Sequence, residues 1–325
     1  MADKGPRRAV LVAGSANIDF VVRVPHIPAP GETVLGGDLS VVPGGKGANQ
    51  AVACARAGGV ETRFLAALGE DAQAALLIAS LEEAGVGLHV VRSHRPTGAA
   101  LITVSDDAEN AIAVASGANA ALSPGDLPDL SDVAWLVLQL ETPLPTVIAF
   151  AQAAKGAGVQ VMLNAAPAQP LPPELLAAVD VLVVNEEELA AIVGRDGSIA
   201  ERLAATGVAC SVATLGARGC CAVVEGGVML QPAFAVEPVD TTAAGDTFCG
   251  ALAAGLAAGA ALPDALRRAA AAAALATTRA GAQTSVPTRA EVMALLTGTG
   301  DRQGMAALAD HCGASVSNER QGSIA

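Results

Sequence analysis

Short apolar runs alternate with stretches of helical periodicity along most of the chain. Strand-like runs occupy residues 9–15, 19–24, 62–69, 133–140, 159–166 and 180–188, and residues 33–42 are expected to add one or two strands. Helical patterns cover residues 48–57, 72–84, 146–157 and 173–178. Near-continuous apolar strands with helices between them are typical of parallel strands that are buried on both faces. The pattern therefore predicts an α/β fold with a Rossmann-like, doubly wound sheet.

Two segments, at about 19–42 and 98–117, break this pattern. They combine strand-like alternation with short connections, so we expect them to form a small antiparallel β lid on the main sheet. The stretch 299–325 is polar and loses periodicity. We therefore expect one domain over residues 8–298, followed by a loosely packed or disordered C-terminal tail.

Composition narrows the possible partners and the compartment. The formal net charge is −13 and no basic run occurs, which excludes nucleic acid as the expected partner. Six cysteines lack a C-x-x-C pair and four histidines lack metal-ligand spacing, so we expect a cytoplasmic protein with reduced thiols. No signal peptide is expected before the first strand. The most apolar window, 248–262, is shorter than the roughly 20 residues of a membrane span, so no membrane partner is expected.

Polar or glycine-rich residues follow several of the expected strands, where open α/β sheets bind their ligands. Asn17 and Asp19, in GSANID, could hydrogen-bond the hydroxyls of a polyol, or could simply cap a turn. In PGGKGANQA (43–51), glycines allow a ligand close to the backbone at a helix entry. This segment lacks P-loop spacing, and an ordinary helix start remains the alternative. Glu141, at the exit of an apolar strand, either contacts a ligand or is the first solvated residue.

Two further segments suit a nucleotide, although each has a structural alternative. In NEEE (185–188), Asn185 and Glu188 are expected to share one face of a helix's first turn, where acidic residues also favour the helix dipole. TLGARG (214–219) is a strand followed by a glycine turn. That turn could close over phosphates or could be an ordinary hairpin.

The segment VDTTAAGDTFCG (239–250) combines small residues with two aspartates at the start of an apolar helix. If the helix begins near Ala243, its first free amides point at one locus and make an anion site. Small residues leave those amides accessible. Asp246 would lie beside the anion, where a carboxylate suits a base for an attacking hydroxyl better than an anion ligand. N-capping is the alternative for Asp240 and Thr241, but it explains Asp246 less well.

The chain resembles the PfkB-type carbohydrate kinases, the ribokinase family, over about residues 8–298. The family's two signatures resemble PGGKGANQAVACARAG (43–58) and DTTAAGDTFCGAL (240–252). GSANID, LQLETP, NEEEL, TLGARG and TRAGAQTSVP match the family in order and spacing. The GGKGANQA form is associated with ribokinases rather than with fructokinases or adenosine kinases. Cys249 takes a place often held by Asn, where a small side chain should fit.

The resemblance implies ATP-dependent phosphorylation of D-ribose at its 5-hydroxyl, giving ribose 5-phosphate and ADP. Asp246 would be the catalytic base, and Ala243, Ala244 and Gly245 would form the anion hole for the γ-phosphate. The sugar would contact Asn17, Asp19, Gly45, Lys46, Asn49 and Glu141. The nucleotide would contact Asn185, Thr214, Gly216, Gly219 and Gly245.

The resemblance also implies two cations and a homodimer formed through the lid. Glu188, with Asn185, would position Mg²⁺ through water, and K⁺ would lie beside the anion hole. The K⁺ ligands would be Asp240, Thr242, Ala276, Arg279, Gly281 and Ser285, several of them through backbone carbonyls.

Two other functions stay open at this point. The chain could phosphorylate another sugar, such as deoxyribose or fructose, because Asp19 and Asn49 indicate a polyol without distinguishing its 2-position. It could also be a non-catalytic sugar-binding regulator. Loss of Asp246, Gly245 or Asn49 would favour the regulator, and all three residues are present.

Overall fold

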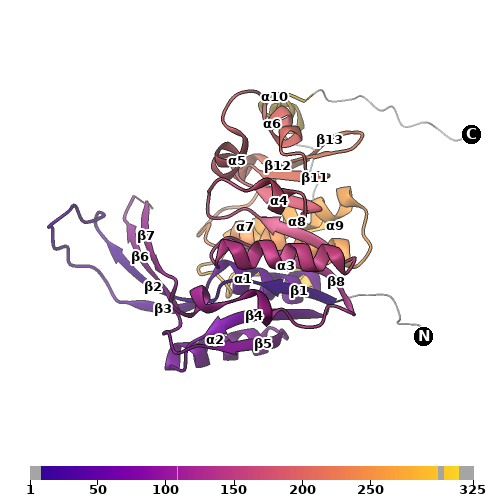
Figure 1. Ribbon diagram of the computed structural model, residues 1–325. Coiled ribbons are helices and arrows are strands. Elements are labelled where there is room, and N and C mark those ends of the chain that lie inside the picture. Colours follow the sequence, from indigo (N-terminus) through magenta and orange to yellow (C-terminus); the bar gives the residue numbers. More distant parts are fainter. Residues whose placement is uncertain (1–8, 108, 299–303, 315–325) are drawn as a thin grey trace, which may run out of the picture.

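A nine-stranded sheet with helices on both faces forms the main body of the molecule in the computed structural model, which describes residues 9–107, 109–298 and 304–314 (Figure 1). Its strand order is β13-β12-β11-β10-β9-β8-β1-β4-β5. The bounds are β1 Ala9–Ala13, β4 Thr62–Leu68, β5 Gly87–Arg92, β8 Val133–Leu138, β9 Gln160–Asn164, β10 Val181–Val184, β11 Cys210–Thr214, β12 Gly219–Val224 and β13 Gly227–Pro232. All strands from β11 to β5 pair in parallel, whereas β12 and β13 are antiparallel. The predicted doubly wound α/β fold is confirmed.

The helices divide between the two faces of this sheet. Their bounds are α1 Lys46–Ala53, α2 Ala72–Glu83, α3 Leu144–Gly156, α4 Pro173–Leu176, α5 Glu186–Val193, α6 Ile199–Ala205, α7 Ala244–Ala257, α8 Leu262–Thr277, α9 Arg289–Gly298 and α10 Met305–Cys312. Strand β1 shows the division, because its side chains alternate between faces. Val10 and Val12 join the buried cluster of α1, α7 and α8, and Leu11 and Ala13 join that of α3, α5 and α6.

Helices α1 and α7 approach each other backbone to backbone. A Cβ at Gly250 would lie 2.5 Å from the Gln50 carbonyl oxygen and 2.5 Å from the Ala53 Cβ, so only glycine fits there. The Cys54 thiol donates to the Gly250 carbonyl at 3.2 Å. This close contact between small residues lets the two polar residues of α1, Asn49 and Gln50, reach the first turn of α7.

The small sheet extends from one side of the main body (Figure 1) and has the order β3-β2-β6-β7. Its strands are β2 Asn17–Val24, β3 Ser40–Gly44, β6 Gly98–Ser105 and β7 Asn110–Ala115. The outer pairs β2–β3 and β6–β7 are antiparallel, as expected. The central pair β2–β6 is parallel, which corrects the expectation of a purely antiparallel lid. The connection from β2 to β6 includes β4, α2 and β5, which is long enough to reverse direction.

Several predicted elements differ from the observed ones. The strand expected over 33–42 is confined to β3, since residues 32–39 have no strand partner and leave Leu35 88% exposed. The apolar run 180–188 stops being a strand at Val184, because Asn185 caps α5. Strands β5, β12 and β13 were not among the expected strands. The disordered tail is wrong for residues 304–314, which contain α10, and the rest of 299–325 lies outside the described residues.

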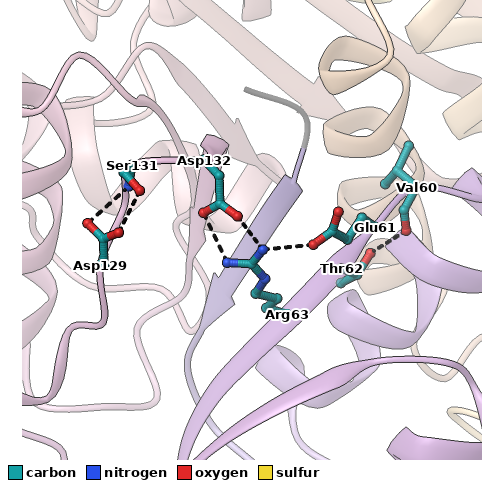
Figure 2. Close-up of polar contacts among 7 residues, drawn as sticks. All are labelled: Val60, Glu61, Thr62, Arg63, Asp129, Ser131 and Asp132. Carbon is teal, nitrogen blue, oxygen red and sulfur yellow. Dashed lines mark hydrogen bonds and ion pairs between the residues drawn. The ribbon is translucent and has the colours of Figure 1, made fainter. Parts of the chain in front are cut away.

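A guanidinium clamp holds three strands together at the edge opposite the strand exits (Figure 2). Arg63 of β4 donates from Nη1 to Asp132 Oδ1 at 3.0 Å and from Nη2 to Glu61 Oε1 at 2.8 Å, and its Nη2 also pairs with the second Asp132 oxygen. Strand β1 lies between β4 and β8, which Asp132 precedes. The clamp therefore links the two strands that flank β1. Within the described residues, no helix has both the length and the apolarity that a membrane crossing requires.

Candidate active site

The site lies where the parallel strands end, at the junction of the two sheets. Gly14 to Ala16 connect β1 to β2, Glu141 follows β8, and Asn164 ends β9. Helix α1 and the start of α7 border the same region, since Asn49 and Gln50 of α1 contact Asp246 of α7. Residues separated by almost 200 positions thus share one polar cluster.

Asp246 is the centre of this cluster and is only 8% exposed. Its Oδ2 accepts from Asn49 Nδ2 at 3.0 Å and its Oδ1 accepts from Gln50 Nε2 at 2.9 Å. Burial raises the pKa of Asp246, and the Glu141 carboxylate adds to this, while Lys46 and the two amides act in the opposite direction. A carboxylate with a raised pKa that is oriented by two donors suits proton abstraction from a hydroxyl near neutral pH.

The orientation of Asp246 depends on a buried amide network that the sequence interpretation missed. Gln50 is 0% exposed, and its Nε2 also donates to Asn164 Oδ1 at 3.1 Å. Its Oε1 accepts from Gln139 Nε2 at 2.7 Å. Gln50 therefore joins the ends of β8 and β9 to the first turn of α7. The only available signal was its place beside Asn49 in GGKGANQA, where two adjacent polar residues at a buried helix start require polar partners.

The first turn of α7 presents free backbone donors beside Asp246. Ala243 precedes the helix with φ 57°, the one positive φ of a non-glycine residue in the described part of the chain. Such backbone strain is often found at ligand-binding turns. Within the described residues, the amides of Gly245 and Asp246 have no hydrogen-bond acceptor. The Ala244 amide, also expected in the anion hole, instead donates to the Thr241 carbonyl at 3.3 Å, which corrects that expectation. A Cβ at Gly245 would meet nothing within 4 Å, so the space in front of the turn is open. The turn therefore has the free donors and the open space that anion binding at a helix start requires.

Polar side chains suited to hydrogen-bonding sugar hydroxyls lie around the space in front of Asp246. Asn17 and Asp19 lie on β2, with exposures of 2% and 8%. The Asn17 Oδ1 accepts from Asn119 Nδ2 at 2.7 Å, so Asn119, another residue missed from sequence, sets the direction of the Asn17 amide. A buried acceptor, Asn49 Oδ1, has no partner within the described chain. Unpaired buried acceptors are costly, so a hydroxyl donor from a ligand is expected at Asn49.

Glu141 belongs to the same cluster. Its Oε2 accepts from the Ser15 hydroxyl at 2.6 Å and from the Lys46 amide at 3.3 Å. Gly45 has φ 89°, and a Cβ there would lie 2.7 Å from the Asn17 amide nitrogen. The glycine at 45 is therefore required by both conformation and space. The structure brings together all six residues expected at the sugar.

Three carboxylates and one amine determine the electrostatics of the cluster. Burial raises the pKa of Asp19 to about 7, and the charges of Glu141 and Asp246 add to the effect. Burial opposes the charge on Lys46, but the carboxylates of Asp246 and Glu141 outweigh it and raise the pKa of Lys46. The Lys46 ammonium therefore partly balances a cluster that is otherwise strongly negative.

A mostly apolar pocket of about 490 Å³ adjoins the anion site. Thr214, Gly216, Gly219 and Gly245, expected at the nucleotide, are among its lining residues. Phe234, Phe248 and alanines of α8 line the pocket too. A pocket of this volume and lining suits a planar base, with its phosphates directed to the first turn of α7.

Asn185 and Glu188 are held by a reciprocal capping box rather than in the pocket lining. Asn185 Oδ1 accepts from the Glu188 amide at 2.8 Å, and Glu188 Oε2 accepts from the Asn185 amide at 2.7 Å. The two residues thus have a structural role at the start of α5, where acidic residues also favour the helix dipole, and Glu188 is in addition buried near the site. Burial raises the pKa of Glu188 and the charge of Asp246 adds to this effect, whereas the Asn185 amide and the charge of Lys46 lower the pKa. The described residues contain no group of three or more His, Cys, Asp or Glu side chains placed to hold a metal.

Two loops bring Asp240, Thr242 and Gly281, three of the six expected K⁺ ligands, into contact. Asp240 accepts from the amides of Thr242 and Gly281, each at 2.9 Å, and its own amide donates to the Thr277 carbonyl at 3.1 Å. Ser285 is 0% exposed and Ala276 precedes Thr277. The Arg279 side chain pairs with Glu291, which leaves only its backbone as a ligand. Carboxylate, hydroxyl and carbonyl oxygens fit a hard cation such as K⁺.

Comparison with known proteins shows the family of this chain. Residues 7–289 match the model of the pfkB family carbohydrate kinases. Ribokinase of Haemophilus influenzae is 38% identical over 303 residues, covering 89% of this chain and 99% of the relative. A ribokinase crystal structure from Thermotoga maritima has a TM-score of 0.83 at 38% identity, covering 89% of this chain and 99% of that one. Arabidopsis thaliana ribokinase complexed with ribose and ATP has a TM-score of 0.82 at 34% identity, covering 90% and 99%. The chain belongs to the PfkB family of carbohydrate kinases.

Proposed function

We propose that the protein is an ATP-dependent ribokinase that phosphorylates D-ribose at the 5-hydroxyl. The observation that carries the proposal is the joint placement of Asp246 and the free amides of α7 at one point. The similar proteins support the substrates, since they are ribokinases and one of them is complexed with ribose and ATP.

The chemistry follows from this placement. Asp246 takes the proton of the 5-hydroxyl as the oxygen forms its bond to the γ-phosphorus, and the bond to the β-phosphate oxygen breaks to release ADP. Asn49 and Gln50 hold the carboxylate in position. The amides of Gly245 and Asp246 stabilise the negative charge on the transferring group. Asn17, Asp19 and Glu141 orient the other hydroxyls, which keeps the reacting oxygen in line.

Two cations belong to the proposal as well. Mg²⁺, which neutralises charge between the β- and γ-phosphates, would be positioned through water near Glu188 and Asn185. K⁺ would be held by the two loops around Asp240, where it would steady the turn that precedes α7. The oxygen donors collected there support this assignment.

A homodimer through the lid and a cytoplasmic location also stay predictions. The small sheet supports the dimer, because Ile112 and Val114 are 56% and 49% exposed on one face of β7. Leu101 of β6 is 58% exposed on the opposite face. Exposed apolar side chains gathered on a sheet are typical of an interaction surface.

A coupled assay of ADP release tests the function. We expect a clear preference for ribose over deoxyribose, fructose and adenosine, and a preference for another sugar would overturn the substrate assignment. Asp246→Asn should lower kcat by several orders of magnitude while ribose still binds. Unchanged turnover in this variant would refute the base. A non-catalytic sugar-binding regulator would release no ADP with any of these four substrates.

A further inference from the structure

Helix α10 lies beyond residues 7–289, which match the family model, yet it packs onto the nucleotide half of the protein. In Figure 1 it lies beside α6, close to the hairpin of β12 and β13. Leu308 and Cys312 are 1% and 0% exposed and belong to the same buried cluster as Leu215. Leu215 immediately precedes Gly216, which lines the proposed nucleotide pocket. The apolar face of α10 thus shares a core with the base of that loop.

The end of α10 is pressed against α6. Gly313 ends the helix with φ 66°, and a Cβ there would lie 2.4 Å from the Cβ of Ser198, which caps α6. The Ala314 amide returns to the Ala309 carbonyl at 2.9 Å. Because Gly313 has a left-handed conformation and leaves no room for a side chain, the end of α10 packs directly against the start of α6. This packing therefore holds the last turn of α10, which includes His311, in place against α6.

One carboxylate connects this turn to the nucleotide loop. Glu186 Oε1 lies 3.1 Å from His311 Nε2, and Arg218 donates to Glu186 Oε2 at 3.1 Å. Each carboxylate oxygen of Glu186 thus has a different partner. Arg218 closes the turn 216–218, in which Gly216 and Ala217 line the pocket. Contacts from α10 therefore reach the pocket wall through two side-chain links.

We propose that α10 is a positioning element for nucleotide binding, in which His311 orients Glu186 and Glu186 holds Arg218 and its loop. This proposal rests on the proposed function, since it assumes ATP in the pocket. His311 touches no expected substrate contact, so it acts only through Glu186. The side chains of Glu186, Arg218 and His311 are 39%, 51% and 31% exposed, and such ion pairs are individually weak. The link therefore adjusts nucleotide affinity by a small factor.

The test uses the full-length protein and compares His311→Ala with Asp310→Ala, a control at an exposed position on the same helix. ATP binding is measured by calorimetry without sugar, and steady-state kinetics give kcat and both KM values. We expect His311→Ala to weaken ATP binding and raise KM for ATP about two- to fivefold. KM for ribose, kcat and Tm should remain at the values of the control. His311→Gln, whose amide can still donate to Glu186, should restore most of the affinity.

A double-mutant cycle provides the second measurement. Arg218→Ala and His311→Ala should combine less than additively in ATP affinity, because both act through the Glu186 carboxylate. Equal ATP affinity in His311→Ala and the control would overturn the proposal, as would a loss of Tm without any change in ATP affinity. Failure of the wild-type chain to bind ATP at all would instead refute the proposed function, so the two failures are distinguishable.

Discussion

Gln50→Met should weaken catalysis in a pH-dependent way, because it removes one of the two amides that hold Asp246. Gln50 is 0% exposed and donates to Asp246 Oδ1 at 2.9 Å, while Asn49 keeps the other oxygen. Methionine fills a similar volume, so cavity formation is small. A hydrogen bond to a charged group contributes about 1.5–3 kcal/mol. At about 1.4 kcal/mol for each factor of ten, kcat/KM for ribose near pH 7 should fall about tenfold to a hundredfold.

The direction of the pH effect follows from the charge on the base. Gln50 stabilises ionised Asp246 and lowers its pKa, so its removal raises the pKa and leaves the base protonated over a wider range. The defect should be largest at acidic pH and shrink as pH rises. The assay is kcat/KM from pH 5.5 to 9.5, with Gln231→Met as the control. Gln231 is a buried glutamine of β13 that donates to the Pro232 carbonyl. An acid limb that stays in place in Gln50→Met would refute this reasoning.

Three further predictions concern charge. Burial raises the pKa of Asp19 to about 7, above its unfolded value, so the unliganded fold loses stability as pH rises from about 4 to about 7. In urea unfolding, the free energy of unfolding of Asp19→Asn relative to the wild type should increase by about 2–4 kcal/mol between pH 5 and pH 8. A difference that does not change with pH would contradict this. Arg63→Ala should lower the free energy of unfolding by about 1 kcal/mol, more at low salt, with kcat retained; unchanged urea midpoints would show that the clamp is dispensable. Replacing K⁺ by Na⁺ in the assay should clearly lower kcat, and indifference to the exchange would remove K⁺ from the site around Asp240.

Local patterns were sufficient to predict the parallel α/β class and to single out most of the residues that gather at the candidate site. Apolar strands and their polar exits are local features, so Asp19, Glu141 and Asp246 could be identified without coordinates. The strand predicted over 33–42 was too long, because residues 32–39 form no strand pairing, although the Gly37 amide donates to the Arg23 carbonyl of β2. Strand pairing is a property of the whole fold, which also explains the unexpected parallel pair of β2 and β6.

The sequence by itself was enough to predict the α/β class, an anion site at the start of α7 and Asp246 as its base, because each prediction depends on the spacing of a few residues. Only the tertiary structure showed that Gln50 and Asn119 orient the site and that α10 packs beside the nucleotide loop. Those contacts join residues about 100 to 200 positions apart. They depend on close approaches such as that of Gly250 to α1. The residues around a glycine do not show which distant segment packs against it.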